Sequence, residues 1–217
     1  MANESHSVQF AGGDLGGQRH ICAFFNSADE EHRVLRSFFK DGFERGEKTT
    51  HIVDPEKREE HLNRLAEAGI NVQQAMDTGQ LELRPWRETY LRGDRFDQDA
   101  AVALIEEILH SGAAAGYALT RLVGHMEWAL LDKPGVNNLL EYETRLNYVL
   151  PKYNDPVICT YDLSKFPASL VMDIMRTHPV VIIGGILQEN PFYVPPDQLL
   201  REIRERQSDR KSAATAN

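Results

Sequence analysis

The sequence predicts an α/β fold in which a mostly parallel sheet is flanked by helices. Short apolar runs of strand length alternate along the chain with longer segments whose apolar residues recur at helical spacing. Such alternation is typical of parallel sheets, because the crossover helices between consecutive strands cover both faces of the sheet. Unusual polar and aromatic residues follow several of the apolar runs, at the positions where this architecture binds ligands.

The predicted strands are six apolar runs bounded by polar or turn residues. The third run is expected at the edge of the sheet, because apolar and polar residues alternate in it and Pro85 lies near its end. In chain order the runs are HICAFF (20–25), THIVD (50–54), LELRPW (81–86), YALTRLVG (117–124), PVICTYD (156–162) and PVVIIGG (179–185).

Four segments between these runs are predicted helices. The first follows side chains at 26–29 that are suited to helix capping. Pro55 is suited to the first position of the second helix, which Gly69 closes. The apolar residues with helical spacing lie within residues 34–43, 62–70, 96–109 and 136–149.

The two ends of the chain differ in composition from the segment between them. Residues 1–18 are polar and rich in glycine, and residues 205–217 are similarly poor in apolar side chains. Such segments cannot bury enough apolar surface to offset the loss of chain entropy. We therefore expect a disordered leader over 1–18, one domain over 19–204, and a disordered tail over 205–217.

Composition excludes several classes of protein. The net charge of −9 disfavours a broad nucleic-acid surface or docking on anionic lipid, because both depend on Lys and Arg. The two cysteines are too few for a disulfide framework, and no signal peptide precedes the first predicted strand. The apolar run at 180–187 is too short for a membrane span. We expect a cytoplasmic protein that contacts neither nucleic acid nor membrane directly.

The loop after the first predicted strand lacks the residues of a phosphate-binding loop. A Walker-type loop needs glycines for close backbone approach and a lysine for the phosphates, whereas this loop is NSADEEHR (26–33). Its three acidic residues would repel phosphate. The ordinary modes of nucleotide binding are therefore excluded here.

The segment RLVGHMEWAL (121–130) is the first candidate for a ligand site, because it ends a predicted strand and leads toward a helix. Arg121 and His125 would anchor a polar group, with Glu127 nearby. Met126 and Trp128 would form an apolar wall. An ordinary strand-to-helix junction, with Met and Trp in the core and the charges in solvent, explains the same pattern equally well.

A second group of candidates combines histidine and cysteine. His20 and Cys22 are two apart on a predicted strand and so face the same side, and Cys159 lies in another strand. Such residues bind zinc or activate a thiolate. No paired ligand spacing supports a metal, however, so we predict buried, structural cysteines and no metal site, and keep these residues as ligand-binding candidates.

Three further residues complete the candidates. Glu143 lies near the leucines of its predicted helix, so its carboxylate is expected to point inward and to need a partner, either Arg121 or His125. Tyr161 would donate a hydrogen bond to a ligand. His178 precedes a proline and fits a turn position better than a binding role.

The order of motifs resembles the MEDS family, the sensory domain named from methanogens, methylotrophs and the dichloromethane-degradation regulator DcmR. The resemblance covers about residues 18–196. The matching motifs are HICAFF, GFERGEKTTHIVD, RLVGHMEW, YETRLN, ICTYDLSKF and THPVVIIGGILQENPFYVPP.

This resemblance implies a three-layer RecA/KaiC-like sandwich that has lost its Walker motifs, and a sensory role for small molecules. Family members often carry a DNA-binding or histidine-kinase module beside this domain. The residues after Pro196 suggest at most one short helix, DQLLREIRER, so output is expected through a partner. The residues that the resemblance carries over are His20, Cys22, Arg121, Glu127, Trp128, Glu143, Cys159, Tyr161 and His178.

We therefore expect a non-catalytic sensory domain that binds a small organic ligand and signals through a protein partner or a homo-oligomer. No cofactor and no catalytic residue are assigned. Three alternatives stay open: an enzyme that uses Cys22 or Cys159 with a nearby histidine, a degenerate nucleotide-binding protein, and a purely structural or interaction protein.

Overall fold

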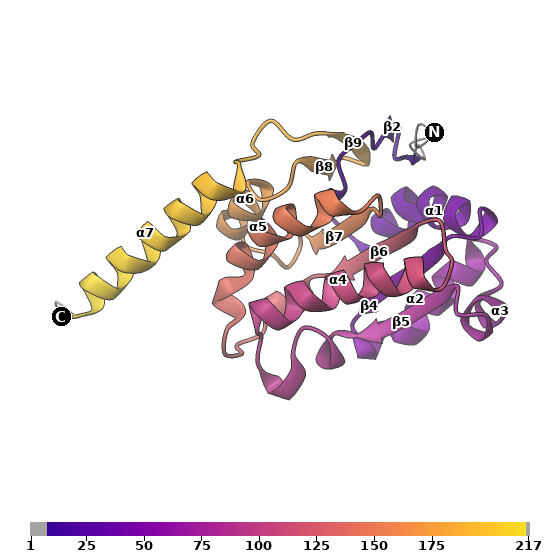
Figure 1. The fold of residues 1–217 in the computed structure, drawn as a ribbon, viewed down its shortest axis with the longest axis horizontal. Coiled ribbons are helices and arrows are strands. Elements are labelled where there is room, and N and C mark those ends of the chain that lie inside the picture. Colours follow the sequence, from indigo (N-terminus) through magenta and orange to yellow (C-terminus); the bar gives the residue numbers. More distant parts are fainter. Residues whose placement is uncertain (1–7, 216–217) are drawn as a thin grey trace.

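The computed structural model describes residues 8–215 and contains a seven-stranded sheet in the order β5-β4-β6-β7-β3-β8-β9 (Figure 1). Six of these strands are mutually parallel, and β9 returns antiparallel to β8. The α/β fold with a mostly parallel sheet is confirmed. The strands are β3 (His20–Phe25), β4 (Lys48–Val53), β5 (Leu81–Pro85), β6 (Thr120–His125), β7 (Val157–Asp162), β8 (Val180–Ile183) and β9 (Ile186–Glu189).

Helices cover both faces of the sheet and make it the middle layer of three (Figure 1). One face carries α4 (Gln98–Ala114), α5 (Leu139–Val149) and α6 (Ala168–Met175). The other face carries α1 (Ala28–Glu44), α2 (Arg58–Glu67) and α3 (Val72–Asp77).

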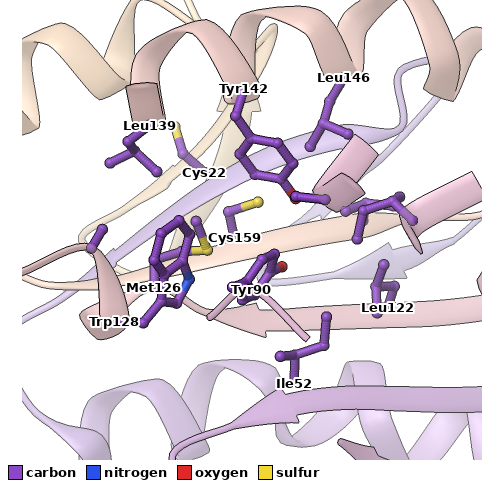
Figure 2. Packing of buried hydrophobic residues seen from close by; sticks show 14 of the residues in the cluster. Cys22, Ile52, Tyr90, Leu122, Met126, Trp128, Leu139, Tyr142, Leu146 and Cys159 are labelled. Carbon is purple, nitrogen blue, oxygen red and sulfur yellow. The ribbon is translucent and has the colours of Figure 1, made fainter. Parts of the chain in front are cut away.

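The core is divided between the two faces by the alternation of side chains along each strand. In β3, Ile21 and Phe25 pack toward α1, whereas Cys22 and Phe24 pack toward α4 and α5. Figure 2 shows the apolar cluster on the face covered by α4 and α5, where side chains of α5 lie over the sheet. Because both faces are covered, β3 (HICAFF) and β8 (VVII) are largely apolar, whereas apolar and polar residues alternate in the edge strand β5 (LELRP).

The N-terminal segment is ordered where we expected a disordered leader. Within the described residues it forms a hairpin of β1 (Gln9–Phe10) and β2 (Gly13–Asp14). Val8, Phe10 and Leu15 are buried, and the ring of Phe10 lies 4.7 Å from that of Phe38 on α1. The expectation was wrong here because these few apolar residues find a surface on α1 that local composition does not reveal. Residues 1–7 of the expected leader lie outside the described residues.

The C-terminal segment also differs from the expected disordered tail. Helix α7 (Pro196–Thr215) continues well past residue 205 and projects away from the sheet (Figure 1). Its first turns are held by the buried side chains of Leu199, Leu200 and Ile203, and it packs against α5. Beyond these turns, Arg206 pairs with Asp173 on α6 at 2.9 Å. None of the helices described between residues 8 and 215 has the length and apolar character needed to cross a bilayer.

Candidate functional site

A cleft lies at the C-terminal ends of the parallel strands, between α1 and α2. Phe25, Val53 and His125, which end β3, β4 and β6, line it together with residues of both helices. We call it the rim cleft. Its cavity volume is about 80 Å³, so it would admit only a compact ligand. Open α/β sheets bind their ligands at this edge.

The start of α1 occupies the position that a phosphate-binding loop would take in such a fold. The hydroxyl of Ser27 accepts a hydrogen bond from the backbone N–H of Glu30, at 3.2 Å. The carboxylate of Glu30 in turn accepts hydrogen bonds from the backbone and the side chain of Asn26, at 2.7 and 2.9 Å. A carboxylate of the protein thus already occupies the positive end of the helix. This arrangement supports the exclusion of phosphate ligands from the loop.

A chain of histidines leads from the buried His51 into the rim cleft. Nδ1 of His51 lies 2.6 Å from Nε2 of His61, and the ring of His61 lies 5.2 Å from that of His125. Nε2 of His125 then lies 2.7 Å from a carboxylate oxygen of Glu31 on α1. Polar side chains on β4, α2, β6 and α1 are therefore in sequential contact across the floor of the cleft.

The protonation states of these histidines differ. Burial lowers the pKa of His51 to about 3 and, together with the neighbouring His51 and His125, lowers the pKa of His61 well below its ordinary value. Burial also acts to lower the pKa of His125, but the carboxylate of Glu31 outweighs it, so the pKa of His125 is raised. One imidazole whose charged form is favoured therefore lies beside two whose neutral form is favoured.

Carboxylates dominate the charge of the rim cleft. Lys57 and Arg64 are its permanent cations, and Arg64 is paired with two carboxylates at 2.8 and 2.9 Å. The acidic side chains in the lining are Glu31, Asp54, Glu60, Glu127 and Asp162. This balance disfavours anionic ligands and favours neutral or cationic molecules that donate hydrogen bonds.

We predict that the pKa of His125 depends on Glu31. In Glu31→Gln, burial acts without the opposing carboxylate, so the pKa of His125 should fall. A raised folded-state pKa means that the pair stabilises the fold fully below the unfolded pKa of about 6.5, and that this contribution is lost as pH rises through the folded value. NMR titration of the imidazole measures the shift.

The control for that titration is Glu44→Gln, which changes an exposed carboxylate near the end of α1. It should leave the pKa of His125 unchanged. A His125 that titrates at or below its ordinary value in the unmodified protein would contradict the prediction.

Arg121 is not part of the rim cleft, and its expected pairing with Glu143 is wrong. It lies near the start of β6, whereas His125 ends the strand, about 13 Å away at strand geometry. Its fully buried guanidinium donates to Glu47 and Asp41, each at 2.5 Å. The side chain crosses α1 at Gly42, where an added Cβ would lie 2.6 Å from Cδ of Arg121. Arg121 therefore joins α1 to the sheet.

Met126 and Trp128 do not form a wall of the rim cleft. Both are fully buried in the core on the opposite face of the sheet (Figure 2). The indole of Trp128 stacks on Tyr90, with ring centroids 4.7 Å apart, and lies 4.6 Å from Phe96. Of the candidate segment, only His125 and Glu127 line the cleft. The apolar lining comes instead from Phe25, Phe39, Val53 and Leu65.

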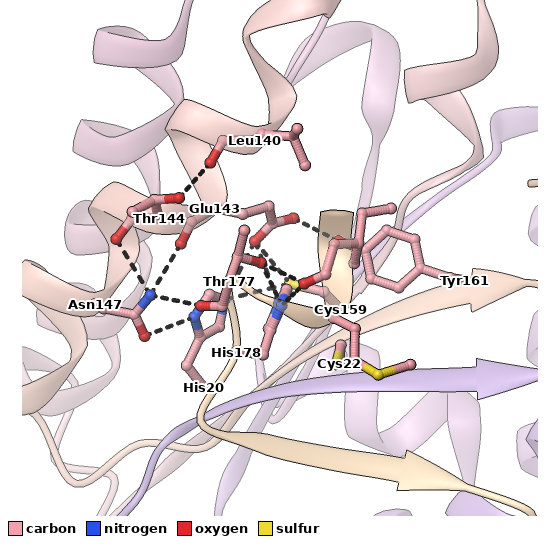
Figure 3. Close-up of polar contacts among 12 residues, drawn as sticks. His20, Cys22, Leu140, Glu143, Thr144, Asn147, Cys159, Tyr161, Thr177 and His178 are labelled. Atoms are coloured by element: carbon pink, nitrogen blue, oxygen red, sulfur yellow. Dashed lines mark hydrogen bonds and ion pairs between the residues drawn. The ribbon is translucent and has the colours of Figure 1, made fainter. Parts of the chain in front are cut away.

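Five other predicted residues meet beneath α5, away from the rim cleft (Figure 3). Oε2 of Glu143 lies 3.2 Å from Nε2 of His20, 3.4 Å from Nε2 of His178 and 3.6 Å from Sγ of Cys159. Its other oxygen, Oε1, accepts a hydrogen bond from the hydroxyl of Tyr161 at 2.7 Å. The partners of the inward-pointing Glu143 are therefore two histidines, not an arginine.

The thiols do not have the properties of a catalytic nucleophile. Cys22 and Cys159 are both buried, and burial, with the neighbouring Glu143, raises the pKa of Cys159 to about 12. Burial lowers the pKa of His20 to about 4. An activated cysteine needs solvent access and a lowered pKa. The geometry therefore gives no support to an enzyme based on either cysteine.

Sequence reasoning missed most of the rim cleft. His51 and His61 are ten residues apart, one inside a strand and one on a helix, and no spacing rule connects them. Nothing in the sequence distinguishes Lys57 and Arg64 from ordinary basic residues on the surface of a helix. A positional signal existed for Lys57, His61 and Arg64, because they lie in the segment that follows the end of β4.

Comparison with known proteins adds a family match and two similar proteins. The family profile described as "MEDS: MEthanogen/methylotroph, DcmR Sensory domain" matches residues 19–179. The transcriptional repressor DcmR of Methylorubrum extorquens (strain DSM 6343 / CIP 106787 / DM4) is 26% identical over 173 residues, 79% of this chain. The chain spans 62% of the length of that relative.

A similar solved structure is the KaiC-like protein PH0186 from Pyrococcus horikoshii OT3, with a TM-score of 0.53 and 16% identity. The match covers 76% of this chain and 71% of that one. At this level of identity the likeness concerns the fold, and it confirms the KaiC-like arrangement of the sheet and its helices.

Proposed function

Because the chain belongs to the MEDS family of sensory domains, we propose that it senses a small organic molecule bound in the rim cleft. The observation that carries this proposal is the position of the cleft, at the C-terminal ends of β3, β4, β6 and β7. Side chains of four strands and two helices converge there, so a bound molecule would contact elements that are far apart in the sequence.

The lining indicates the class of ligand. Apolar contact is available from Phe25, Phe39, Val53 and Leu65, and hydrogen bonds are available from His61 and several carboxylates. A buried neutral imidazole recognises a polar group without contributing charge. We infer a neutral or cationic organic molecule with a compact apolar body and at least one hydrogen-bond donor.

The contact between Glu31 and His125 supplies a route for the signal. It joins the first turn of α1 to the end of β6 across the cleft. A ligand that donates a hydrogen bond to Glu31 would compete with His125 and shift the population of α1 positions. The relative DcmR is a transcriptional repressor, so we infer a transcriptional response as the output, passed on by a protein partner or by self-association.

The proposal predicts that cleft carboxylates govern affinity. In calorimetric titrations of small organic amines, neutral amides and carboxylic acids, amines and amides should bind and acids should not. Glu31→Gln should weaken amine binding about tenfold or more, because a charge-assisted hydrogen bond is lost. Glu107→Gln, an exposed carboxylate on α4 outside the cleft, should bind like the unmodified protein.

A second variant distinguishes the loss of a ligand contact in the cleft from an indirect effect of Glu31→Gln on the position of α1. His61→Leu removes a hydrogen-bonding ring from the cleft while keeping an apolar side chain of similar size. Ligands that bind both Glu31→Gln and His61→Leu as tightly as the unmodified protein would show that the rim cleft is not the sensory site.

A further inference from the structure

The side chains beneath α5 include four potential metal ligands that converge on one point. They are His20 at the start of β3, Glu143 on α5, Cys159 in β7, and His178 just before β8. Nε2 of each histidine, Sγ of the cysteine and one oxygen of the carboxylate all lie within 4.8 Å of one another (Figure 3). All four residues are almost completely buried. We propose that these residues form a tetrahedral site for a divalent transition metal, with Zn²⁺ as the best fit.

Four of the six separations between the ligand atoms are close to the edges of a zinc tetrahedron, and all six are within 4.8 Å. Zinc binds nitrogen and oxygen at about 2.0–2.2 Å and sulfur at about 2.3 Å, so neighbouring ligand atoms are separated by about 3.3–3.6 Å. Oε2 of Glu143 lies 3.2 Å from Nε2 of His20, 3.4 Å from Nε2 of His178 and 3.6 Å from Sγ of Cys159. Sγ of Cys159 lies 3.8 Å from Nε2 of His20. A cation at the centre would need only small side-chain adjustments.

Surrounding hydrogen bonds orient both imidazoles for metal binding. Nδ1 of His20 lies 3.1 Å from Oδ1 of Asn147. The amide nitrogen of Asn147 donates to the backbone carbonyl of Thr177 at 2.8 Å, which directs its oxygen toward His20. Nδ1 of His178 lies 3.2 Å from the carbonyl of Ile174. Nδ1 of His178 also lies 2.7 Å from Oγ1 of Thr177, whose hydroxyl donates to the same carbonyl. Because all of these partners can accept, each Nδ1 can carry the hydrogen and leave the lone pair of Nε2 for a cation.

The carboxylate is oriented in the same way. The hydroxyl of Tyr161 donates to Oε1 of Glu143, which leaves Oε2 facing the histidines and the thiol. Nε2 of His178 is a buried nitrogen without a hydrogen-bond partner among the described residues. Metal-binding histidines and carboxylates are characteristically held by such outer hydrogen bonds. The network therefore presents four donor atoms inward and satisfies the remaining polar atoms outward.

A divalent cation would be balanced in charge by its four ligands. One carboxylate, one thiolate and two neutral imidazoles carry a total charge of −2, so a divalent ion makes the buried site neutral. An isolated buried charge is costly, whereas a balanced set is not. The cation also stabilises the thiolate, so the thiol of Cys159 loses its proton when the metal binds.

The ligand set indicates a structural role for the metal. Four protein side chains complete a tetrahedron and leave no position open for a substrate, as in structural zinc sites. The ion would tie α5 to β3, to β7 and to the segment that precedes β8. Cys22, which lies nearby, stands outside the set, because its Sγ contacts the backbone carbonyl of Val180 at 3.7 Å. It therefore provides a matched control.

The test is metal analysis of the full chain purified without chelators. We expect about one zinc ion per chain in the unmodified protein and in Cys22→Ser, and almost none in a Cys159→Ala/His178→Ala double variant. After replacement of zinc by Co²⁺, the unmodified protein and Cys22→Ser should show a thiolate-to-cobalt charge-transfer band. Cys159→Ser should keep the visible cobalt bands and lose the charge-transfer band.

Metal analysis of the unmodified protein is enough to refute the proposal, even if a variant fails to fold. A folded chain that holds no metal as purified, and that binds neither Zn²⁺ nor Co²⁺ after treatment with a chelator, would show that the cluster is a metal-free hydrogen-bonded ion pair. A cobalt charge-transfer band that survives in Cys159→Ser but is lost in Cys22→Ser would equally refute this set of ligands.

Discussion

Replacing Arg121 by Met is expected to lower the free energy of unfolding by about 3–5 kcal/mol. The guanidinium is fully buried and pairs with Glu47, whose side chain is only 3% exposed, and with Asp41. Removing one partner of a buried ion pair leaves the other charge desolvated and uncompensated, and this accounts for most of the loss. Denaturant unfolding followed by circular dichroism measures the change.

The matched control is Arg45→Met. Arg45 pairs with the same Asp41, at 2.7 Å, but half of its side chain is exposed. Exposed pairs contribute little, so this variant should lose at most about 1 kcal/mol. Equal losses for the two arginines would contradict the structural role of Arg121. Once each variant is folded, ligand affinity in the rim cleft should be unchanged, because Arg121 lies at the other end of β6.

Replacing Trp128 by Ala is expected to destabilise the fold by about 3–5 kcal/mol without a direct effect on ligand binding. The indole is fully buried and packs between Tyr90 and Phe96, so truncation leaves a large cavity. Met172→Ala, at a side chain that is 53% exposed, is the control and should change stability little. Denaturant titration and calorimetry on the same samples separate stability from affinity.

This second prediction distinguishes a core residue from a wall of the ligand site. Phe39→Ala should weaken ligand binding as well as stability, because Phe39 lines the rim cleft. If Trp128→Ala lost affinity while Phe39→Ala kept it, the ligand site would lie on the other face of the sheet.

The position of Arg121 shows why local pattern misplaced part of the site. The apolar run at 117–124 suggests that Arg121 lies in the second half of a strand, near the edge that binds ligands. The strand begins only at Thr120, whose backbone N–H donates to the carboxylate of Asp155, 35 residues away. That contact comes from a distant loop, so the periodicity of apolar residues cannot predict where β6 begins. It therefore cannot predict that Arg121 lies near the start of the strand rather than near its end.

The ends of the chain illustrate the same limit. Residues 1–18 as a whole are polar and rich in glycine, and this composition favours disorder. Phe10 is nevertheless buried against Phe38, and the backbone of Ala11 accepts a hydrogen bond from Leu187 in β9. A short segment becomes ordered when a surface formed elsewhere accepts it, and local sequence does not describe that surface.

By itself the sequence determined the alternation of strands and helices, the parallel sheet, the edge position of β5, the absence of a phosphate loop and the family of the chain. These properties follow from hydrophobic period and from local motifs, which act over a few residues. Only the tertiary structure determined which side chains that are far apart in the sequence contact one another. It brought His61, His125 and Glu31 into one cleft, and Glu143 beneath α5 between His20 and His178. Strand order and helix packing set these distances, which spacing along the chain does not contain.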